Sequence, residues 1–256
     1  SERQLEDYIK AVKRPHGLVL ISGPTGSGKS TTLYATLRML NNEISNILTI
    51  EDPVEYTLAG VNQVQLKEEI GLTFGSALRA FLRQDPDIIM LGEIRDTDTA
   101  QMAIRSALTG HMLLSTIHTN SAWGSISRLV DMNIHPYLIS NTLILSVAQR
   151  LVRILCPCCK QPIESGDELT KMNLPDVECY YRPVGCEECF YTGYKGRKAI
   201  YEVIPIDNEL SNAIRESKDE IECECKKRGI TTLKDSAYRL FKEGYISIEE
   251  LIPLIQ

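Results

Sequence analysis

A glycine-rich segment near the start of the chain has the residue types and spacing of a phosphate-binding loop. It contains the pattern G-x-x-x-x-G-K-S and consists of Gly23, Pro24, Thr25, Gly26, Ser27, Gly28, Lys29, Ser30 and Thr31. Glycines let the backbone curl so that its N–H groups point at phosphate oxygens. Lys29 can then reach the β- and γ-phosphates, and the Ser30 hydroxyl can bind Mg²⁺. The segment predicts a nucleoside triphosphate site; the alternative is a ligand-free strand-to-helix turn.

Two apolar stretches end in carboxylates. Residues 47–50 are followed by Glu51 and Asp52, and residues 87–92 are followed by Glu93. The second stretch looks like a Walker B strand with glutamate in the usual aspartate place, where a carboxylate holds Mg²⁺ directly or through its waters. Ligands of open α/β sheets bind at the carboxyl ends of strands, so both acids are candidates to face phosphates. For the first stretch, a solvated acidic turn is the alternative.

Arginine and histidine side chains add further candidates. Arg79 and Arg83 share one face of a helix predicted over residues 73–84. From there they could bind phosphate or pair with surface acids. His118 follows an apolar stretch at residues 111–117, where strand ends meet a nucleotide. A structural role for this histidine is the alternative.

Two C-x-x-C pairs indicate a metal site. Cys156 and Cys159 form one pair, and Cys186 and Cys189 form the other. Paired knuckles of this kind match a Cys₄ zinc site, and four thiolates leave no open coordination position, so the zinc should be structural. Four free thiols are the alternative, and a redox role is less favoured. The other four cysteines show no partner pattern.

Composition narrows the class of protein. The net charge is −6, which disfavours nonspecific binding of nucleic acid. No apolar run approaches the roughly 18 residues that a membrane span needs, and the N-terminus shows no signal-peptide pattern. Because a nucleotide site needs a compartment that holds nucleotide, the expected location is cytoplasmic, with reduced thiols.

The order of elements predicts the fold that positions these residues. Apolar stretches separated by helical patterns over residues 17–150 indicate an α/β fold with a mostly parallel, doubly wound sheet. Residues 97–108 carry a regular helical stripe. Residues 141–153 are expected to form the last helix of this core, and residues 208–256 have an amphipathic helical pattern.

Together these motifs resemble the type II secretion and type IV pilus assembly ATPases, the GspE/PilB-like secretion superfamily. The resemblance rests on four segments in order, which correspond to the Walker A, Asp, Walker B and His boxes of that family: residues 23–31, 50–55, 91–96 and 109–120. It implies that Glu51 orients the attacking water, that Glu93 acts on Mg²⁺ and that His118 senses the γ-phosphate. It also implies that Arg79 and Arg83 reach nucleotide or a neighbouring subunit.

The same resemblance implies partners and cofactors. The family works as a homohexamer with ATP and Mg²⁺, and its assembly and secretion branch carries a tetracysteine zinc (Zn²⁺) module, which retraction relatives generally lack. Family members normally carry N-terminal domains that dock to inner-membrane platform proteins. These are expected to be missing here, and the location is then cytoplasmic, peripheral to the inner face of the cell membrane. Direct nucleic-acid binding is not expected.

The organisation expected from motifs and resemblance has four parts. They are a short helix and linker over 1–16, a RecA-like P-loop ATPase core over 17–150, a zinc module over 151–200 and a mostly helical C-terminal subdomain over 201–256. The expected function is ATP hydrolysis that powers assembly of a pilus or pseudopilus. The alternatives are a nucleic-acid-translocating RecA-like ATPase, which would need a basic groove, and a nucleotide-gated scaffold without hydrolysis, which turnover would exclude.

Overall fold

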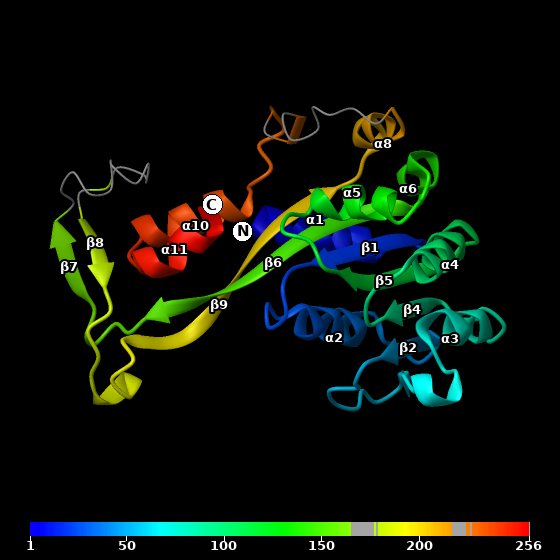
Figure 1. The fold of residues 1–256 in the computed structure, drawn as a ribbon, viewed down its shortest axis with the longest axis horizontal. Helices are drawn as coiled ribbons and strands as arrows, with labels where there is room; N and C mark the ends of the chain where they lie inside the picture. Colours follow the sequence, from blue (N-terminus) through cyan, green and yellow to red (C-terminus); the bar gives the residue numbers. More distant parts are fainter. Residues whose placement is uncertain (165–176, 178, 217–223, 226, 256) are drawn as a thin grey trace. The chain divides into compact units, whose positions relative to one another are not determined.

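A seven-stranded sheet with the strand order β3-β2-β4-β5-β1-β6-β9 organises the chain (Figure 1). The structure, a computed structural model, describes residues 1–256 apart from 165–176, 178, 217–223, 226 and 256. The strands of this sheet are β1 (Gly17–Ser22), β2 (Ile47–Glu51), β3 (Asn62–Gln65), β4 (Ile88–Leu91), β5 (Met112–Ile117), β6 (Leu143–Leu155) and β9 (Tyr194–Pro205). A second sheet pairs β7 (Gln161–Glu164) antiparallel with β8 (Cys179–Arg182).

The described residues form two compact units. Residues 1–148 and 203–230 make up unit 1, and residues 149–202 and 231–256 make up unit 2. The C-terminal residues 201–256 are therefore divided between the units rather than gathered in one of them. The division into four functional parts that the sequence suggests remains a prediction, because these two units are defined by compactness and not by function.

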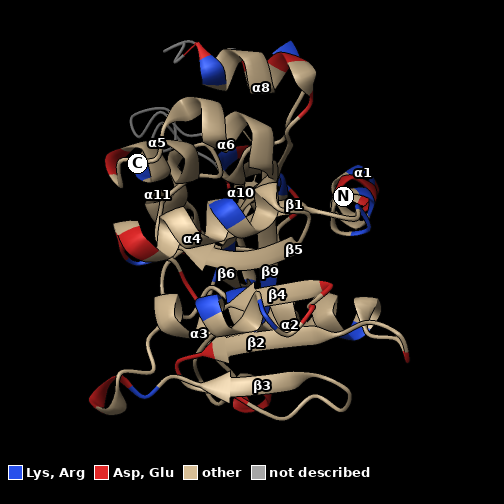
Figure 2. Ribbon diagram, turned by 90° about the vertical axis from the view of Figure 1, so that its right-hand side faces the viewer, with Lys and Arg blue, Asp and Glu red and all other residues tan. Residues whose placement is uncertain are grey.

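Unit 1 is built on parallel strands with buried side chains. β2 pairs with β3 and β4, β5 pairs with β4 and β1, and β1 pairs with β6, all in parallel. Every residue of β1, β4 and β5 is buried, and none is charged, so these strands are tan throughout in Figure 2. Continuous apolar runs of this kind are typical of a parallel sheet covered by helices. The predicted α/β class with a mostly parallel sheet is confirmed.

Helices connect these strands and cover the sheet. Those of unit 1 are α1 (Glu2–Val12), α2 (Lys29–Leu40), α3 (Phe74–Phe81), α4 (Thr97–Leu108), α5 (Gly124–Asp131), α6 (Pro136–Thr142) and α8 (Asn208–Arg215), with a 3₁₀ turn η1 (Glu68–Ile70). Right-handed crossovers put α2 on one face and α3, α4 and α6 on the other. In agreement, α4 packs against α3 and α6, and α1 joins α2 through a 2.6 Å hydrogen bond between the Tyr8 and Thr36 hydroxyls.

The ends of two predicted helices have local causes. α4 begins as predicted because the Asp96 carboxylate caps it, accepting a 2.7 Å hydrogen bond from the Thr99 backbone N–H. α3 ends at Phe81, three residues before the predicted end. Asp85, just before Pro86, adopts a left-handed backbone with φ 50°, so the chain turns there instead of continuing the helix.

The helix expected over residues 141–153 is wrong. α6 ends at Thr142 and the chain continues as strand β6, which lies between β1 and β9 in the sheet. Most of its residues from Leu143 to Gln149 are buried. A strand buried on both faces shows no alternation of apolar and polar residues, so its sequence cannot be told from that of a buried helix by periodicity.

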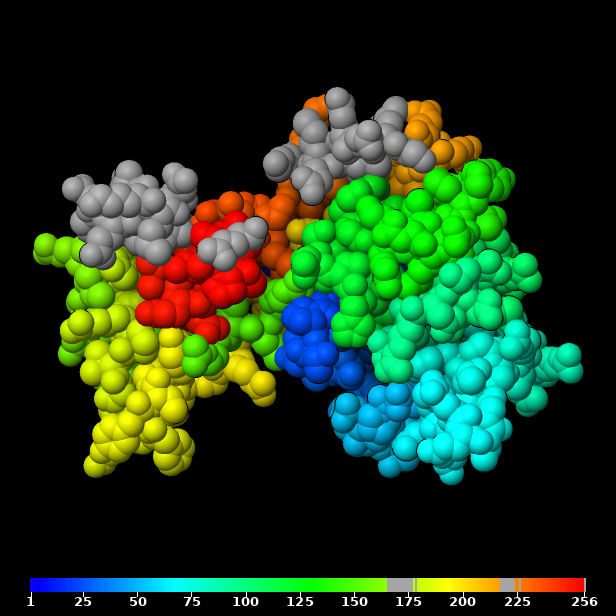
Figure 3. Space-filling view, in the orientation of Figure 1, coloured from blue at the N-terminus to red at the C-terminus, as the bar shows by residue number. Residues whose placement is uncertain are grey.

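Unit 2 contains the outer parts of β6 and β9, the antiparallel pair β7–β8, a 3₁₀ turn η2 (Glu187–Cys189) and helices α10 (Leu233–Lys242) and α11 (Ile248–Ile255). Arg153 of β6 pairs with Glu250 of α11 at 2.7 Å, and its guanidinium lies 4.0 Å from the ring centroid of Tyr194. Tyr180 of β8 stacks on Phe241 of α10, with ring centroids 5.8 Å apart. Figure 3 shows these red C-terminal helices lying against the green and yellow strands.

Among the described residues, none of the helices combines the length and the apolar character that crossing a membrane would require.

Candidate functional site

The loop between β1 and α2 has the conformation that phosphate binding needs. Gly26 and Gly28 have φ of 78° and 85°, a left-handed backbone that favours glycine, and Gly28 directly precedes α2. Residues 24–26 are exposed. The Lys29 ammonium lies across the loop and donates to the carbonyl oxygens of Gly23 and Pro24 at 2.8 and 3.0 Å. Lys29 is thus beside the loop that would hold phosphate.

The parallel sheet brings the predicted site residues to one edge. The loop follows β1, Glu51 ends β2, Glu93 follows β4 by two residues, and His118 follows β5 directly. The register pairs Ile50 with Leu91, Leu91 with Ser115, and Ser22 with Ile117. Because these four strands are adjacent and parallel, their carboxyl ends meet at the edge where ligands of open α/β sheets bind.

Glu93 and His118 are in direct contact at this edge. His118 Nε2 lies 3.1 Å from Glu93 Oε2, and the Arg95 guanidinium pairs with Glu93 Oε1. Arg95 also lies 3.3 Å from an Asp52 carboxylate oxygen. Backbone hydrogen bonds fix the segment: Gly92 N–H donates to Ile50 O on one side, and Ile94 N–H donates to Thr116 O on the other. Glu93 therefore belongs to a fixed cluster of charged groups.

Glu51 is held more tightly than Glu93. Its side chain is buried, and both carboxylate oxygens accept hydrogen bonds. The Tyr34 hydroxyl donates to Oε2, while the Thr49 hydroxyl and the Gln63 amide donate to Oε1 at 2.6 and 3.0 Å. Burial, and then the hydrogen bond to Glu51, raise the pKa of Tyr34 to about 12, so its hydroxyl stays protonated at neutral pH.

Arg79 and Arg83 are both exposed. Arg79 lies on α3, and Arg83 lies two residues beyond its end. Neither makes an ion pair or a side-chain hydrogen bond with any residue that the structure describes. Among the described residues they therefore have no polar contact with the phosphate-binding loop, and a role toward nucleotide or another subunit stays a prediction.

The residues of unit 1 fit ATP and Mg²⁺. The loop presents glycines with positive φ, a lysine and a helix start, which together suit the phosphates of a nucleotide. Ser30 is exposed on the first turn of α2, and Glu93, whose oxygens contact Arg95 and His118, lies two residues after β4, so a hydroxyl and a carboxylate lie at this edge for Mg²⁺ to bind directly or through its waters. These are the donors that the sequence predicted.

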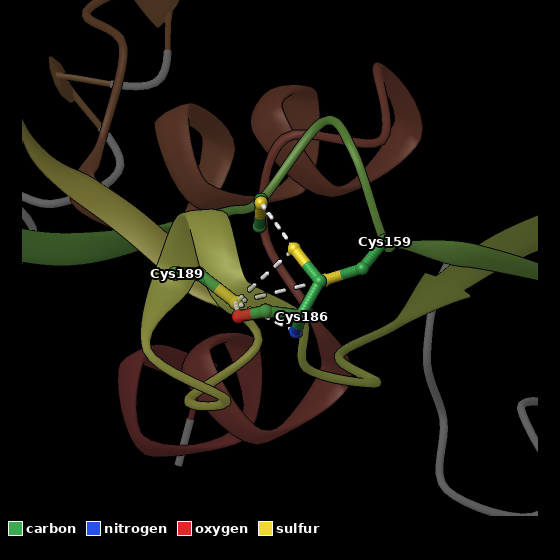
Figure 4. A group of neighbouring side chains, drawn as sticks. Cys159, Cys186 and Cys189 are labelled. Atoms are coloured by element: carbon green, nitrogen blue, oxygen red, sulfur yellow. Dashed lines mark hydrogen bonds between the residues drawn. The ribbon is translucent and has the colours of Figure 1, made fainter.

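The predicted zinc ligands converge in unit 2. The Sγ atoms of Cys156, Cys159, Cys186 and Cys189 all lie within 4.8 Å of one another. The pairs 156–186, 159–189 and 186–189 are separated by 3.9, 3.8 and 3.8 Å. Four sulfurs placed tetrahedrally about 2.3 Å from one zinc ion would be about 3.8 Å apart. The thiols of Cys159, Cys186 and Cys189 face one another in Figure 4, and the cluster of four fits zinc in geometry and in donor type.

Backbone N–H groups support these thiols. Cys189 Sγ accepts from the N–H groups of Cys186 and Gly193, both at 3.2 Å, and Cys159 Sγ accepts from Gly185 at 3.3 Å. Burial raises the pKa of the Cys189 thiol, but the N–H groups of Cys186 and Gly193 together with the Cys159 and Cys186 thiols outweigh it, and the pKa falls to about 6. Gly193 has φ 79°, and a Cβ there would lie 2.4 Å from Pro183, so this turn needs glycine. N–H groups that donate to ligand sulfurs in this way orient the ligands toward a metal.

Comparison with known proteins identifies the family. A family profile described as "Type II/IV secretion system protein" matches residues 1–253. The chain belongs to this family. It is 49% identical over 253 residues to the type IV pilus assembly ATPase PilB of Myxococcus xanthus, covering 96% of this chain and 45% of that protein. It is 45% identical over 251 residues to the type II secretion system ATPase E of Vibrio cholerae, covering 96% of this chain and 50% of that protein.

Solved structures of related proteins agree with this family assignment. The pilus retraction motor PilT with bound ADP matches 97% of this chain and 64% of its own, with a TM-score of 0.75 and 31% identity. The ATPase DotB of Legionella pneumophila matches 98% of this chain and 63% of its own, with a TM-score of 0.70 and 25% identity. The resemblance drawn from the sequence motifs is thereby confirmed. The chain spans about half the length of the curated relatives it matches.

Some residues that contact the predicted acids were not among the predicted site residues, Arg95, Tyr34 and Gln63 among them. Arg95 could have been suspected, because it lies two residues after Glu93 at the same strand end. Tyr34 and Gln63 gave no sequence signal, since each reaches Glu51 from a separate element, 17 and 12 residues away.

Proposed function

We propose that this chain is the C-terminal motor part of a ring-forming ATPase that binds MgATP, hydrolyses it and powers assembly of a pilus or of the pseudopilus of type II secretion. The observation that carries the proposal is the meeting of the phosphate-binding loop, Glu51, Glu93 and His118 at the ends of four adjacent parallel strands. Membership in the secretion family supports the biological role. The roles of individual residues rest on their positions at this edge.

Nucleotide binding is assigned to the loop and the start of α2. Backbone N–H groups of residues 23–28 and the positive end of α2 favour the phosphates. Lys29 exchanges the carbonyl oxygens of Gly23 and Pro24, its present partners, for phosphate oxygens. Ser30 and Glu93 would hold Mg²⁺, which would supply positive charge to the phosphates.

Hydrolysis is assigned to groups at the neighbouring strand ends. Phosphoryl transfer to water needs positioning and charge stabilisation more than covalent participation. Glu51 orients the attacking water, and His118, held by Glu93 at 3.1 Å, senses the γ-phosphate. Arg95 neutralises part of the charge on Glu93 and Asp52.

Assembly and location complete the proposal. The active form is a homohexamer in which Arg79 and Arg83 act toward a nucleotide of the same or a neighbouring subunit. The motor is cytoplasmic and peripheral to the inner face of the cell membrane, and it docks to inner-membrane platform proteins through domains outside this chain. The zinc module has a structural role. Its presence favours the assembly and secretion branch over pilus retraction.

Replacing Lys29 by alanine tests nucleotide binding. The variant is expected to bind MgATP at least 30-fold more weakly, because loss of a charge paired with phosphate costs about 2 kcal/mol or more. Titration with a fluorescent ATP analogue measures this, and Lys67→Ala, at an exposed lysine beyond β3, is the control. Unchanged affinity in Lys29→Ala would contradict the assignment of the loop, and absence of turnover in the wild type would contradict the function.

From the exposed Arg79 and Arg83 we predict that ATP turnover depends on the assembly of subunits. Specific activity is expected to rise with protein concentration, because arginines supplied to a γ-phosphate contribute on the order of 10³–10⁵ in rate in well-studied GTPases. Arg79→Ala and Arg83→Ala should each lower turnover at least about 10-fold and change affinity less. Arg3→Ala, at an exposed arginine of α1, is the control. A fully active monomer with flat specific activity over about a hundredfold dilution would rule this role out.

A further inference from the structure

A buried polar cluster connects the helix after the phosphate-binding loop to the acid at the end of β2. It consists of Tyr34 on α2, Thr49 and Glu51 on β2, and Gln63 on β3. Tyr34, Thr49 and Glu51 are at most 4% exposed. A carboxylate removed from water in this way is stable only where hydrogen bonds replace its hydration, and here donors approach both of its oxygens.

Tyr34 has a different position in this cluster from the other two donors. Thr49 lies on the same strand as Glu51, and Gln63 lies on the strand paired with it. Both donors therefore fix Glu51 relative to the sheet and not relative to a helix. Tyr34 lies on α2, the helix that begins at Lys29, and is therefore part of the element that would contact the phosphates. Its hydroxyl is the donor from the nucleotide-binding helix to Glu51 among the residues that the structure describes.

The Tyr34 side chain is itself fixed in place. Its hydroxyl donates to Glu51 and accepts a 3.1 Å hydrogen bond from the Glu55 backbone N–H. Its ring packs edge-on against Tyr56, with centroids 4.6 Å apart. A side chain held at both ring and hydroxyl transmits a displacement of α2 to the Glu51 carboxylate, because it has no freedom to absorb it.

We propose that Tyr34 is a positioning residue that couples the phosphate-binding helix α2 to the orientation of Glu51. The inference rests on the proposed ATPase function and adds to it a residue that touches neither nucleotide nor water. When ATP draws the start of α2 toward the phosphates, the Tyr34 hydroxyl sets where the Glu51 carboxylate points. Turnover then depends on Tyr34, and ATP affinity does not.

Tyr34→Phe is the direct test, because it removes the hydroxyl and keeps the ring. Turnover (kcat) is expected to fall about 10-fold, since a small misplacement of a catalytic group has effects of this order. The Kd for MgATP should change less than about 2-fold. Tyr56→Phe is the matched control: it removes a hydroxyl from the adjoining ring, whose side chain is 45% exposed, and should leave kcat unchanged.

A double-mutant cycle separates positioning from a general loss of stability. If Tyr34 acts through Glu51, adding Tyr34→Phe to Glu51→Gln should reduce single-turnover rates less than 2-fold further, whereas independent effects would multiply. Thr49→Val removes the other hydroxyl donor to Glu51 and should show the same split between kcat and Kd. Because Thr49 lies on β2, this variant tests only whether Glu51 needs its donors for turnover. If Tyr34→Phe fails to fold, hydrogen exchange of the wild type provides the test: on addition of a non-hydrolysable ATP analogue, protection should change together in α2 and at residues 48–51 of β2, and a change confined to α2 would contradict the coupling.

The outcomes distinguish this inference from the function on which it rests. If the wild type hydrolyses ATP and a folded Tyr34→Phe variant has an unchanged kcat, the role of Tyr34 is overturned and the proposed function is not. A Tyr34→Phe variant that loses affinity as much as turnover would make Tyr34 a structural residue and also overturn the inference. A wild type that binds ATP without hydrolysing it would overturn the proposed function, and the positioning role with it.

Discussion

Glu93→Gln is expected to bind MgATP with little change in affinity and to hydrolyse it about 10²–10³-fold more slowly, the loss found when one group that stabilises transition-state charge is removed. The amide keeps the shape of the side chain and loses the charge that faces Arg95 and His118. Steady-state phosphate release and binding of a fluorescent nucleotide, measured on the same preparation, check the two halves of this prediction separately.

The matched control for Glu93→Gln is Glu69→Gln, which makes the same chemical change at an exposed position in η1. It should retain full turnover. Turnover near the wild-type level in Glu93→Gln would show that this glutamate is not the Walker B acid. A large loss of ATP affinity would instead indicate that its contact with Arg95 and His118 shapes the binding site before any chemistry occurs.

The strand ends of the site were predictable because their signals are local. β1, β2, β4 and β5 are each mostly apolar and buried, a polar side chain lies at or within two residues of each carboxyl end, and parallel strands place these ends at one edge. The phosphate-binding loop, Glu51, Glu93 and His118 could therefore be placed together from the sequence. The contact between His118 and Glu93 follows from the adjacency of β4 and β5, which only the sheet order provides.

Other features depend on packing between distant segments and had no local signal. β6 resembles a helix in sequence because its buried residues show no alternation, and its place between β1 and β9 makes it a strand. Two of the three hydrogen bonds to Glu51 come from other elements, one before it and one after it in the chain. In the cysteine module, Phe190 and Tyr191 have left-handed backbones with φ 50° and 59°, which bulky residues rarely adopt.

The four-cysteine cluster leads to the second large expected effect. The wild-type chain is expected to hold about one zinc ion, with Zn–S distances near 2.3 Å. Serine at Cys156, Cys159, Cys186 or Cys189 should release it, because three thiolates no longer close the coordination sphere. Metal analysis of protein prepared without chelators measures the stoichiometry, and X-ray absorption measures the Zn–S distances.

Loss of the metal should affect unit 2 and spare the nucleotide site. Binding energy of a structural zinc is folding energy, since the ligand set does not exist in the unfolded chain. Hydrogen exchange should therefore rise across residues 149–164 and 179–202, whereas the loop at residues 23–31, which belongs to unit 1, keeps its affinity for MgATP. Cys158→Ser is the matched control, because this exposed cysteine lies between two ligands in sequence and outside the cluster. Wild-type protein without zinc would refute the site, and loss of zinc from Cys158→Ser equal to that from Cys159→Ser would show that the ligand set is wrong.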